Sequence, residues 1–223
     1  ALEDYGPAIV DFTSALETGG PDVALLIARG SARFYNDENS AALADFDLAI
    51  ALDPENPEAF YYRGLVHTEY DDNHKAVVDF AQAIALDADY ADAFYYRARN
   101  LAAMGRFEEA INDFTKAIEL NPFDGWAFVG RGEAFMDLGR HERAILDFEQ
   151  MIVVDPQEPT GYARRADAQM ELQRPEEALR DIETALQFDP EAADLHVQRG
   201  ILMLEKGHYA EADANFDKAL KLD

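Results

Sequence analysis

ADAFYYRARNLAAMGRFEEAINDFTKAIELNPFD, residues 91–124, contains the pattern that decides the fold, because related segments recur along the chain at a spacing of 34 residues. Internal repeats of this length predict an array in which each repeat stacks on its neighbours. We expect a single array over residues 1–223. The array begins with a half repeat, residues 1–22. Five full repeats follow, namely 23–56, 57–90, 91–124, 125–158 and 159–192. The last repeat, residues 193–223, is short at its C-terminal end.

Small and large apolar residues occupy fixed positions in these repeats. Position 8 is Gly or Ala, position 20 is Ala throughout, and position 27 is Ala except at Met151. Position 24 is large and apolar in all copies, namely Phe12, Phe46, Phe80, Phe114, Phe148, Ile182 and Phe216. Spacings of four and three place positions 20, 24 and 27 on one face of a helix. Each repeat is therefore predicted to contain two helices, A and then B, whose small residues allow the backbones to approach closely.

Turn residues separate the predicted helices. Position 15, between A and B, is one of Asp37, Asp71, Gly105, Gly139, Gln173 and Gly207. After helix B, prolines such as Pro122 and Pro156 disfavour a helical conformation in the preceding residue.

This combination of residues resembles the tetratricopeptide repeat family over essentially the whole chain. Its local departures from the family pattern are Met151, Ile182, Ala88 in place of a proline and His196 in place of an aromatic residue. The resemblance implies an all-α, right-handed superhelical solenoid of antiparallel helix pairs, with the A helices lining a concave groove. The physical argument agrees, because one helix pair alone cannot bury its apolar face.

The net charge restricts the partners. The 45 Asp and Glu residues outnumber the 19 Lys and Arg residues, which gives a net charge of −26. Such a field repels phosphate backbones and anionic lipids, so we expect no nucleic-acid and no membrane partner. No apolar run approaches the roughly 18 residues of a membrane span. We expect a soluble protein, cytoplasmic or extracytoplasmic, and the start at Ala1 suggests a processed or excised chain.

Catalytic and metal-binding patterns are not found in the sequence. The five histidines fall at unrelated repeat positions, and the absence of cysteine excludes disulfides, thiolate nucleophiles and Cys-ligated metals. The sequence also contains no phosphate-binding glycine loop and no nucleophile elbow. We therefore predict no enzyme activity, no catalytic residue, no metal and no cofactor.

Two repeated charged positions predict a structural ladder of ion pairs. Position 7 is Arg29, Arg63, Arg97, Arg131, Arg165 and Arg199, and position 23 is Asp11, Asp45, Asp79, Asp113, Asp147 and Asp181, with Asn215 in the last repeat. An anion-binding stripe is the alternative, but position 7 adjoins packed positions, which favours ion pairs. Because Asn215 cannot pair with Arg199, we expect each aspartate to pair with the arginine of the following repeat, beginning with Asp11 and Arg29.

The exposed face of the A helices is the predicted partner-binding groove. Its candidate residues are largely aromatic, namely Phe34, Tyr35, Tyr61, Tyr62, Leu65, Tyr95, Tyr96, Arg99 and Trp126. Aromatic side chains with polar tips are favoured contact residues. The alternative is that Tyr61, Tyr62, Tyr95 and Tyr96 only pack on neighbouring A helices.

The sequence favours a non-catalytic scaffold that binds a peptide or protein segment in this groove. Acidic groove residues such as Glu58, Asp92 and Glu133 favour a partner with Lys or Arg and apolar anchors. One alternative is a structural protein that self-associates by stacking through open solenoid ends near Leu220 and Leu222. Another is the regulatory arm of a larger protein.

Overall fold

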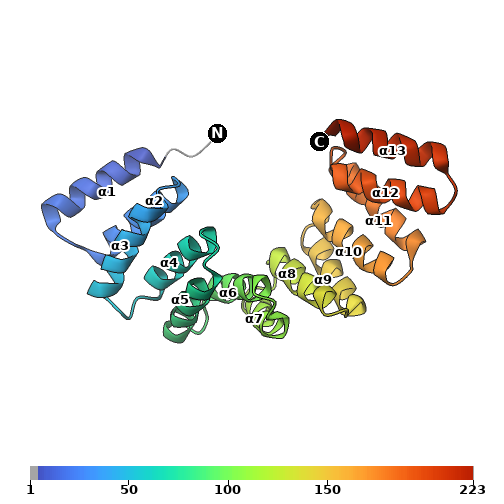
Figure 1. The fold of residues 1–223 in the computed structure, drawn as a ribbon. Coiled ribbons are helices and arrows are strands. Elements are labelled where there is room, and N and C mark those ends of the chain that lie inside the picture. The colour runs from blue at the N-terminus through green and yellow to red at the C-terminus, as the bar shows by residue number, and fades with distance from the viewer. Residues whose placement is uncertain (1–4, 223) are drawn as a thin grey trace. The chain divides into compact units, whose positions relative to one another are not determined.

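The computed structural model describes residues 5–222 and consists, over that range, of thirteen helices and no strand (Figure 1). The helices are α1 (Gly6–Gly19), α2 (Val23–Tyr35), α3 (Asn39–Leu52), α4 (Pro57–Glu69), α5 (Asn73–Leu86), α6 (Ala91–Ala103), α7 (Phe107–Leu120), α8 (Gly125–Asp137), α9 (His141–Val154), α10 (Pro159–Glu171), α11 (Pro175–Phe188), α12 (Ala193–Glu205) and α13 (Tyr209–Leu222). None of them is both long and apolar enough to cross a bilayer.

The fold is an all-α array of helical repeats. The even-numbered helices are the A helices, and the odd-numbered ones are the B helices. The helices fall into two compact units, residues 1–120 with α1 to α7 and residues 121–223 with α8 to α13. Within each unit the two helices of a repeat pack on each other, and neighbouring A helices also touch, such as α4 on α6 and α8 on α10.

A single left-handed residue makes the turn from helix A to helix B. Position 15 has a positive φ in every repeat, from 54° at Asp71 to 79° at Gly207. The next residue then donates its backbone N–H to a carbonyl five residues earlier, as Asp72 does to His67 at 2.9 Å. This bond satisfies a carbonyl at the end of the A helix. The turn residues predicted from the sequence therefore have a direct conformational role.

Acidic side chains also shape the connection to the following repeat. Asp53, Asp87, Asp155 and Asp189 each accept a hydrogen bond from the backbone N–H two residues later, at 3.0 to 3.1 Å. Aspartate favours such turns because its short side chain reaches its own backbone. Part of the excess of acidic residues is therefore required by the backbone and not by a partner.

The core of each repeat is the contact between position 24 and position 8. Phe46, Phe80, Phe114, Phe148 and Ile182 are at most 1% exposed. At the facing position of the repeat 57–90, a Cβ added to Gly64 would lie 2.8 Å from Cε1 of Phe80. The two helices approach so closely that the ring of Phe80 occupies the space that a side chain at position 64 would need. The apolar stripe predicted from the sequence is thus buried from Phe46 to Ile182, whereas Phe12 and Phe216 near the two ends are half-buried.

Met151, which departs from the repeat pattern, is accommodated by two glycines. Position 27 is otherwise Ala, and the longer side chain of Met151 is 2% exposed. A Cβ added to Gly125 would overlap the sulfur of Met151, and one added to Gly161 would lie 3.1 Å from its Cγ. The glycines at these two positions therefore create the volume that the methionine fills.

Replacing Phe80 by Ala tests this packing. Because Phe80 is fully buried, the Phe80→Ala variant should lose about 3–5 kcal/mol of unfolding free energy. Phe123→Ala is the matched control, since Phe123 is 83% exposed and its loss should change stability by less than about 0.5 kcal/mol. Urea unfolding followed by circular dichroism measures both. A loss below about 1 kcal/mol for Phe80→Ala would contradict the packing register.

Candidate functional site

The position-7 arginines pair with the position-23 aspartates of their own repeats. Arg63, for example, donates from Nε and Nη2 to the two carboxylate oxygens of Asp79 at 2.8 and 2.6 Å. The same two-bond geometry, between 2.6 and 3.0 Å, joins Arg29 to Asp45, Arg97 to Asp113, Arg131 to Asp147 and Arg165 to Asp181. These five carboxylates are buried. We call this row the arginine–aspartate ladder.

The predicted pairing of each aspartate with the arginine of the next repeat was wrong. Position 7 adjoins position 8, and position 23 adjoins position 24, so the close contact of positions 8 and 24 within one repeat brings the charged pair together. Asp11 is accordingly exposed, and Arg29 reaches Asp45 instead. Because Asn215 stands at position 23 of the last repeat, Arg199 has no carboxylate at that position of its own repeat.

Some of the arginines do connect repeats, but through position 25 of the preceding repeat. Arg63 donates from Nη1 to Asp47 at 2.7 Å, and Arg199 donates from Nη2 to Glu183 at 3.1 Å. Arg29 likewise donates to the Thr13 hydroxyl at 3.3 Å. Hydrogen bonds to Asp79 and Asp47 raise the pKa of Arg63 above its usual value. Because five of the six arginines are bound to buried aspartates, they form a structural row and not an open anion-binding stripe.

The tyrosines at position 6 pack between repeats. Tyr62 of α4 stacks on Phe46 of α3 with ring centroids 5.7 Å apart, and Tyr96 of α6 stacks on Phe80 of α5 at 6.0 Å. Each ring therefore covers the position-24 phenylalanine of the preceding repeat. Tyr62 and Tyr96 therefore pack between repeats, but against the preceding B helices and not only on neighbouring A helices as the sequence alternative had it.

Tyr61 is the centre of an aromatic cluster on the face where α4 and α6 lie side by side. Its ring centroid is 4.9 Å from that of Tyr90, 5.3 Å from that of Tyr62 and 5.9 Å from that of Tyr96. Burial raises the pKa of the Tyr61 hydroxyl, and the nearby Tyr96 and Asp92 add to the rise. Tyr90 was missed by the sequence analysis, because position 34 precedes helix A and falls outside the helical periodicity.

The remaining predicted groove residues differ in exposure. Leu65 is only 6% exposed and packs in the core with Phe80, so its assignment to an open groove needs correction: the side chain turns toward the B helix. Tyr35 is 54% exposed and stacks on Tyr5, with Phe34 beside it. The Arg99 guanidinium lies over the rings of Tyr95 and Tyr96, 5.9 and 5.8 Å from their centroids. Trp126 lies in the first turn of α8 in the second compact unit and is 49% exposed.

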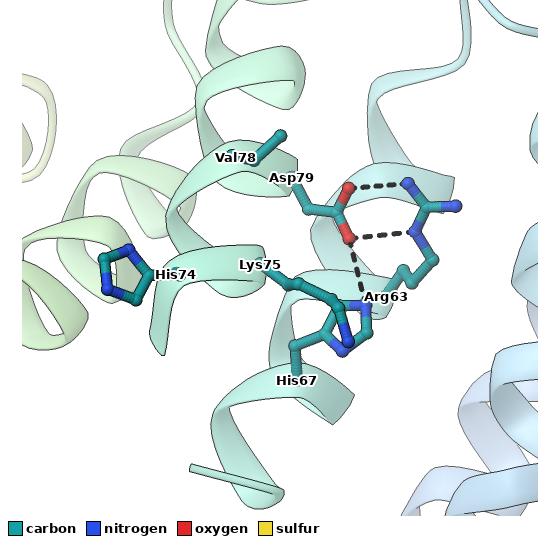
Figure 2. Close-up of a pocket in the computed structure, with 6 residues that line it drawn as sticks. All are labelled: Arg63, His67, His74, Lys75, Val78 and Asp79. Carbon is teal, nitrogen blue, oxygen red and sulfur yellow. Dashed lines mark hydrogen bonds and ion pairs between the residues drawn. The ribbon is translucent and has the colours of Figure 1, made fainter. Parts of the chain in front are cut away.

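A cavity of about 420 Å³ lies next to the ladder between α4 and α5. Figure 2 shows its lining residues, with Asp79 bonded to Arg63 and near His67, and with the Lys75 side chain extending toward His67. His67 Nε2 is 3.7 Å from the Asp79 carboxylate, and burial lowers the pKa of His67 despite this acid. His67 occupies position 11, where the first full repeat has Arg33, which donates to Asp45 at 2.7 Å.

No described residues form an evident metal site, since no three His, Cys, Asp or Glu side chains within residues 5–222 are grouped to hold an ion. His196 is 5% exposed and contacts Asn215 and the Pro190 carbonyl, whereas His74 and His208 are exposed.

Comparison with known families identifies the repeat. Family models described as "Tetratricopeptide repeat" and "TPR repeat" match residues 95–159 and 164–223, and residues 30–69, respectively. The chain belongs to the tetratricopeptide repeat family. Proteins of this family are generally non-catalytic scaffolds for protein–protein interaction.

Several solved structures share the fold at low sequence identity. A tetratricopeptide repeat protein from Parabacteroides merdae has a TM-score of 0.75 and 23% identity, covering 98% of this chain and 87% of its own. YrrB, described as having an unusual peptide-binding site, has a TM-score of 0.70 and 22% identity over 93% of this chain and all of its own. MamA has a TM-score of 0.70 and 20% identity over 77% and 94% of the two chains. No curated protein matched the chain.

Restoring the missing carboxylate in the last tetratricopeptide repeat should stabilise it. Arg199 has a buried Nε without a hydrogen-bond partner, and unsatisfied buried donors are destabilising. Asn215→Asp should therefore raise the unfolding free energy by about 1 kcal/mol. Thermal and urea unfolding measure the change. If Asn215→Asp stabilises equally in an Arg199→Gln background, the gain does not come from this pair.

Protonation of His67 should make this tetratricopeptide array less stable as the pH falls below about 6.5, the usual pKa of a histidine. Its pKa is lowered in the folded state by burial, with Lys75 and Arg63 opposing the attraction of Asp79 and Asp72. As the pH falls, His67 is therefore protonated in the unfolded chain before it is protonated in the folded protein. The contribution of His67 to stability is fully present above about pH 6.5 and declines below it. His67→Leu, which copies Leu101 of the next repeat, should reduce this decline between pH 7.5 and 5 in urea titrations. An equal decline in both proteins would contradict the prediction.

Proposed function

We propose that the protein is a non-catalytic scaffold that binds a peptide or protein segment bearing Lys or Arg and apolar anchors on the face of its A helices. The observation that supports this proposal most strongly is the aromatic cluster around Tyr61 in the first compact unit. Tyr61, Tyr62 and Tyr90 are half-buried, and their hydroxyls form no hydrogen bond within residues 5–222. Exposed Tyr35 extends the same chemistry to α2.

Charge supports a cationic partner for this face. Glu58 and Asp92 are exposed in the first turns of α4 and α6, next to the aromatic cluster. Arg99 is the base on this face, and its guanidinium lies over Tyr95 and Tyr96. Oppositely charged surfaces accelerate encounter and select against wrong partners. A segment with Lys or Arg near the carboxylates and apolar side chains on the rings would match both features.

The rings in this cluster are suited to a binding role even though they also pack. Tyr61 and Tyr95 contact Phe80 and Phe114 of their own repeats, at 6.0 and 5.8 Å between centroids. Such contacts hold the rings in place, and a rigid aromatic surface loses little side-chain entropy when a partner binds. YrrB, a structural relative of the chain, is described as having a peptide-binding site, which agrees with this class of function.

The proposal is tested with peptides selected from a random library on the wild-type protein, and affinities are measured by fluorescence anisotropy. Tyr61→Ala combined with Tyr95→Ala should weaken binding at least tenfold, because two central contact residues are removed. Glu58→Lys combined with Asp92→Lys should weaken a basic peptide similarly without altering the aromatic packing.

Val78→Ala is the control, since Val78 is 67% exposed on the B helix α5. It should bind as the wild type does, and circular dichroism should show that all variants remain folded. Failure to select any peptide, or unchanged affinity in both double variants, would refute the proposed function.

A further inference from the structure

A second pocket, of about 300 Å³, lies where the A helices α8 and α10 pack together in the second compact unit. Five of its lining residues come from these A helices, and the ring of Phe148 from α9 completes it. The lining consists of Glu133, Met136, Asp137, Phe148, Arg164 and Asp167. The volume is at the lower end of ligand pockets, which suits one side chain better than a whole small molecule.

The charges in this pocket are unbalanced. The carboxylates of Glu133, Asp137 and Asp167 face a single base, Arg164. Arg164 Nε lies 3.0 Å from Glu133, and its Nη1 lies 3.5 Å from Asp167. The Arg164 side chain is 48% exposed, so these pairs are screened by solvent and weak enough for another cation to compete. Asp137 makes no ion pair within residues 5–222.

The groups around Asp167 do not fully offset the cost of burying its negative charge. Gln198 of α12 donates from Nε2 to its carboxylate at 2.8 Å. Even so, burial raises the pKa of Asp167 above its usual value, and Asp194 adds repulsion that offsets part of the effect of Arg164. A further positive charge next to this carboxylate would therefore interact favourably with it.

The apolar lining suits the stem of a long basic side chain. Met136 is a flexible thioether, and the buried Phe148 also lines the pocket. Lysine and arginine commonly lay their methylene groups along apolar surface while the charged group stays among polar atoms. The acids and the apolar groups of the lining together provide both environments.

We propose that this pocket receives one lysine or arginine side chain of the partner segment. The proposal rests on the proposed function of the A-helix face as a binding surface, and it adds a defined subsite for one residue of the partner. The resident Arg164 shows that the carboxylates are placed to hold a guanidinium, since it already bridges two of them.

The test uses single-residue probes, so it does not require the partner to be known. N-acetyl-lysine methylamide and N-acetyl-arginine methylamide are titrated into the full chain, and the backbone amides are followed by NMR. We expect saturable shifts at amides of α8 and α10. N-acetyl-norleucine methylamide, which keeps the stem but lacks the charge, should bind at least tenfold more weakly.

Neutral isosteres test the carboxylates. Glu133→Gln combined with Asp167→Asn keeps hydrogen-bond acceptors for Arg164 and Gln198, and it should weaken the lysine probe at least tenfold. Asp213→Asn combined with Asp217→Asn makes the same charge change at exposed positions of α13 and should leave the affinity unchanged. Equal weakening by both double variants would show general attraction to an acidic protein and would overturn the subsite.

Arg164→Ala gives a test with the opposite sign. Removing the competing base should strengthen binding of the lysine probe several-fold, and a weaker affinity would contradict the proposal. Absence of saturable shifts, or equal binding of the lysine and norleucine probes, would also overturn it. These outcomes are separate from the peptide test, because the peptide variants lie in residues 1–120 and the probe variants in residues 121–223.

Discussion

The close approach of the two helices within each repeat is the constraint on which the other features depend. At Gly64 the space that a Cβ would need is taken by the ring of Phe80. Large residues such as Phe80 can be fully buried between the two helices of a repeat only because the facing position has a small side chain or none. Ala98 opposite the buried Phe114 shows that one methyl group is still accommodated, so the limit is on volume and not on glycine as such.

The arginine–aspartate ladder follows from this contact. Its members flank the small and the aromatic residue in sequence, so the packing places them together and buries the carboxylates. Burial also has a cost, as Asp147 shows: its pKa is raised by desolvation even though Arg131 donates two hydrogen bonds to it. The pairs therefore specify register more than they add net stability. Outer nitrogens of Arg63 and Arg199 also reach position 25 of the preceding repeat, which ties neighbouring repeats together inside each compact unit.

The negative charge of the protein has several origins with different consequences. Aspartates of the ladder are neutralised by arginine, and those after the B helices are used by turns, as with Asp53. The acids that remain on the A helices, such as Glu58, Asp92 and Asp167, belong neither to the ladder nor to these turns. The aromatic cluster and the α8–α10 pocket both place carboxylates beside apolar groups. This arrangement matches a partner that offers positive charge on an apolar stem.

The sequence by itself determined the helical repeats, the left-handed turns and the buried stripe, because these depend on residues close together in the chain and repeat in register. It also indicated an aromatic face, but not that Tyr62 and Tyr96 would cover the preceding phenylalanines while Tyr90 joined Tyr61. Only the tertiary structure decided how the arginines pair and which groove residues are buried. Both depend on how one helix is rotated and shifted against another, and a side chain reaches whichever neighbour that packing brings near, as Arg29 does with Asp45.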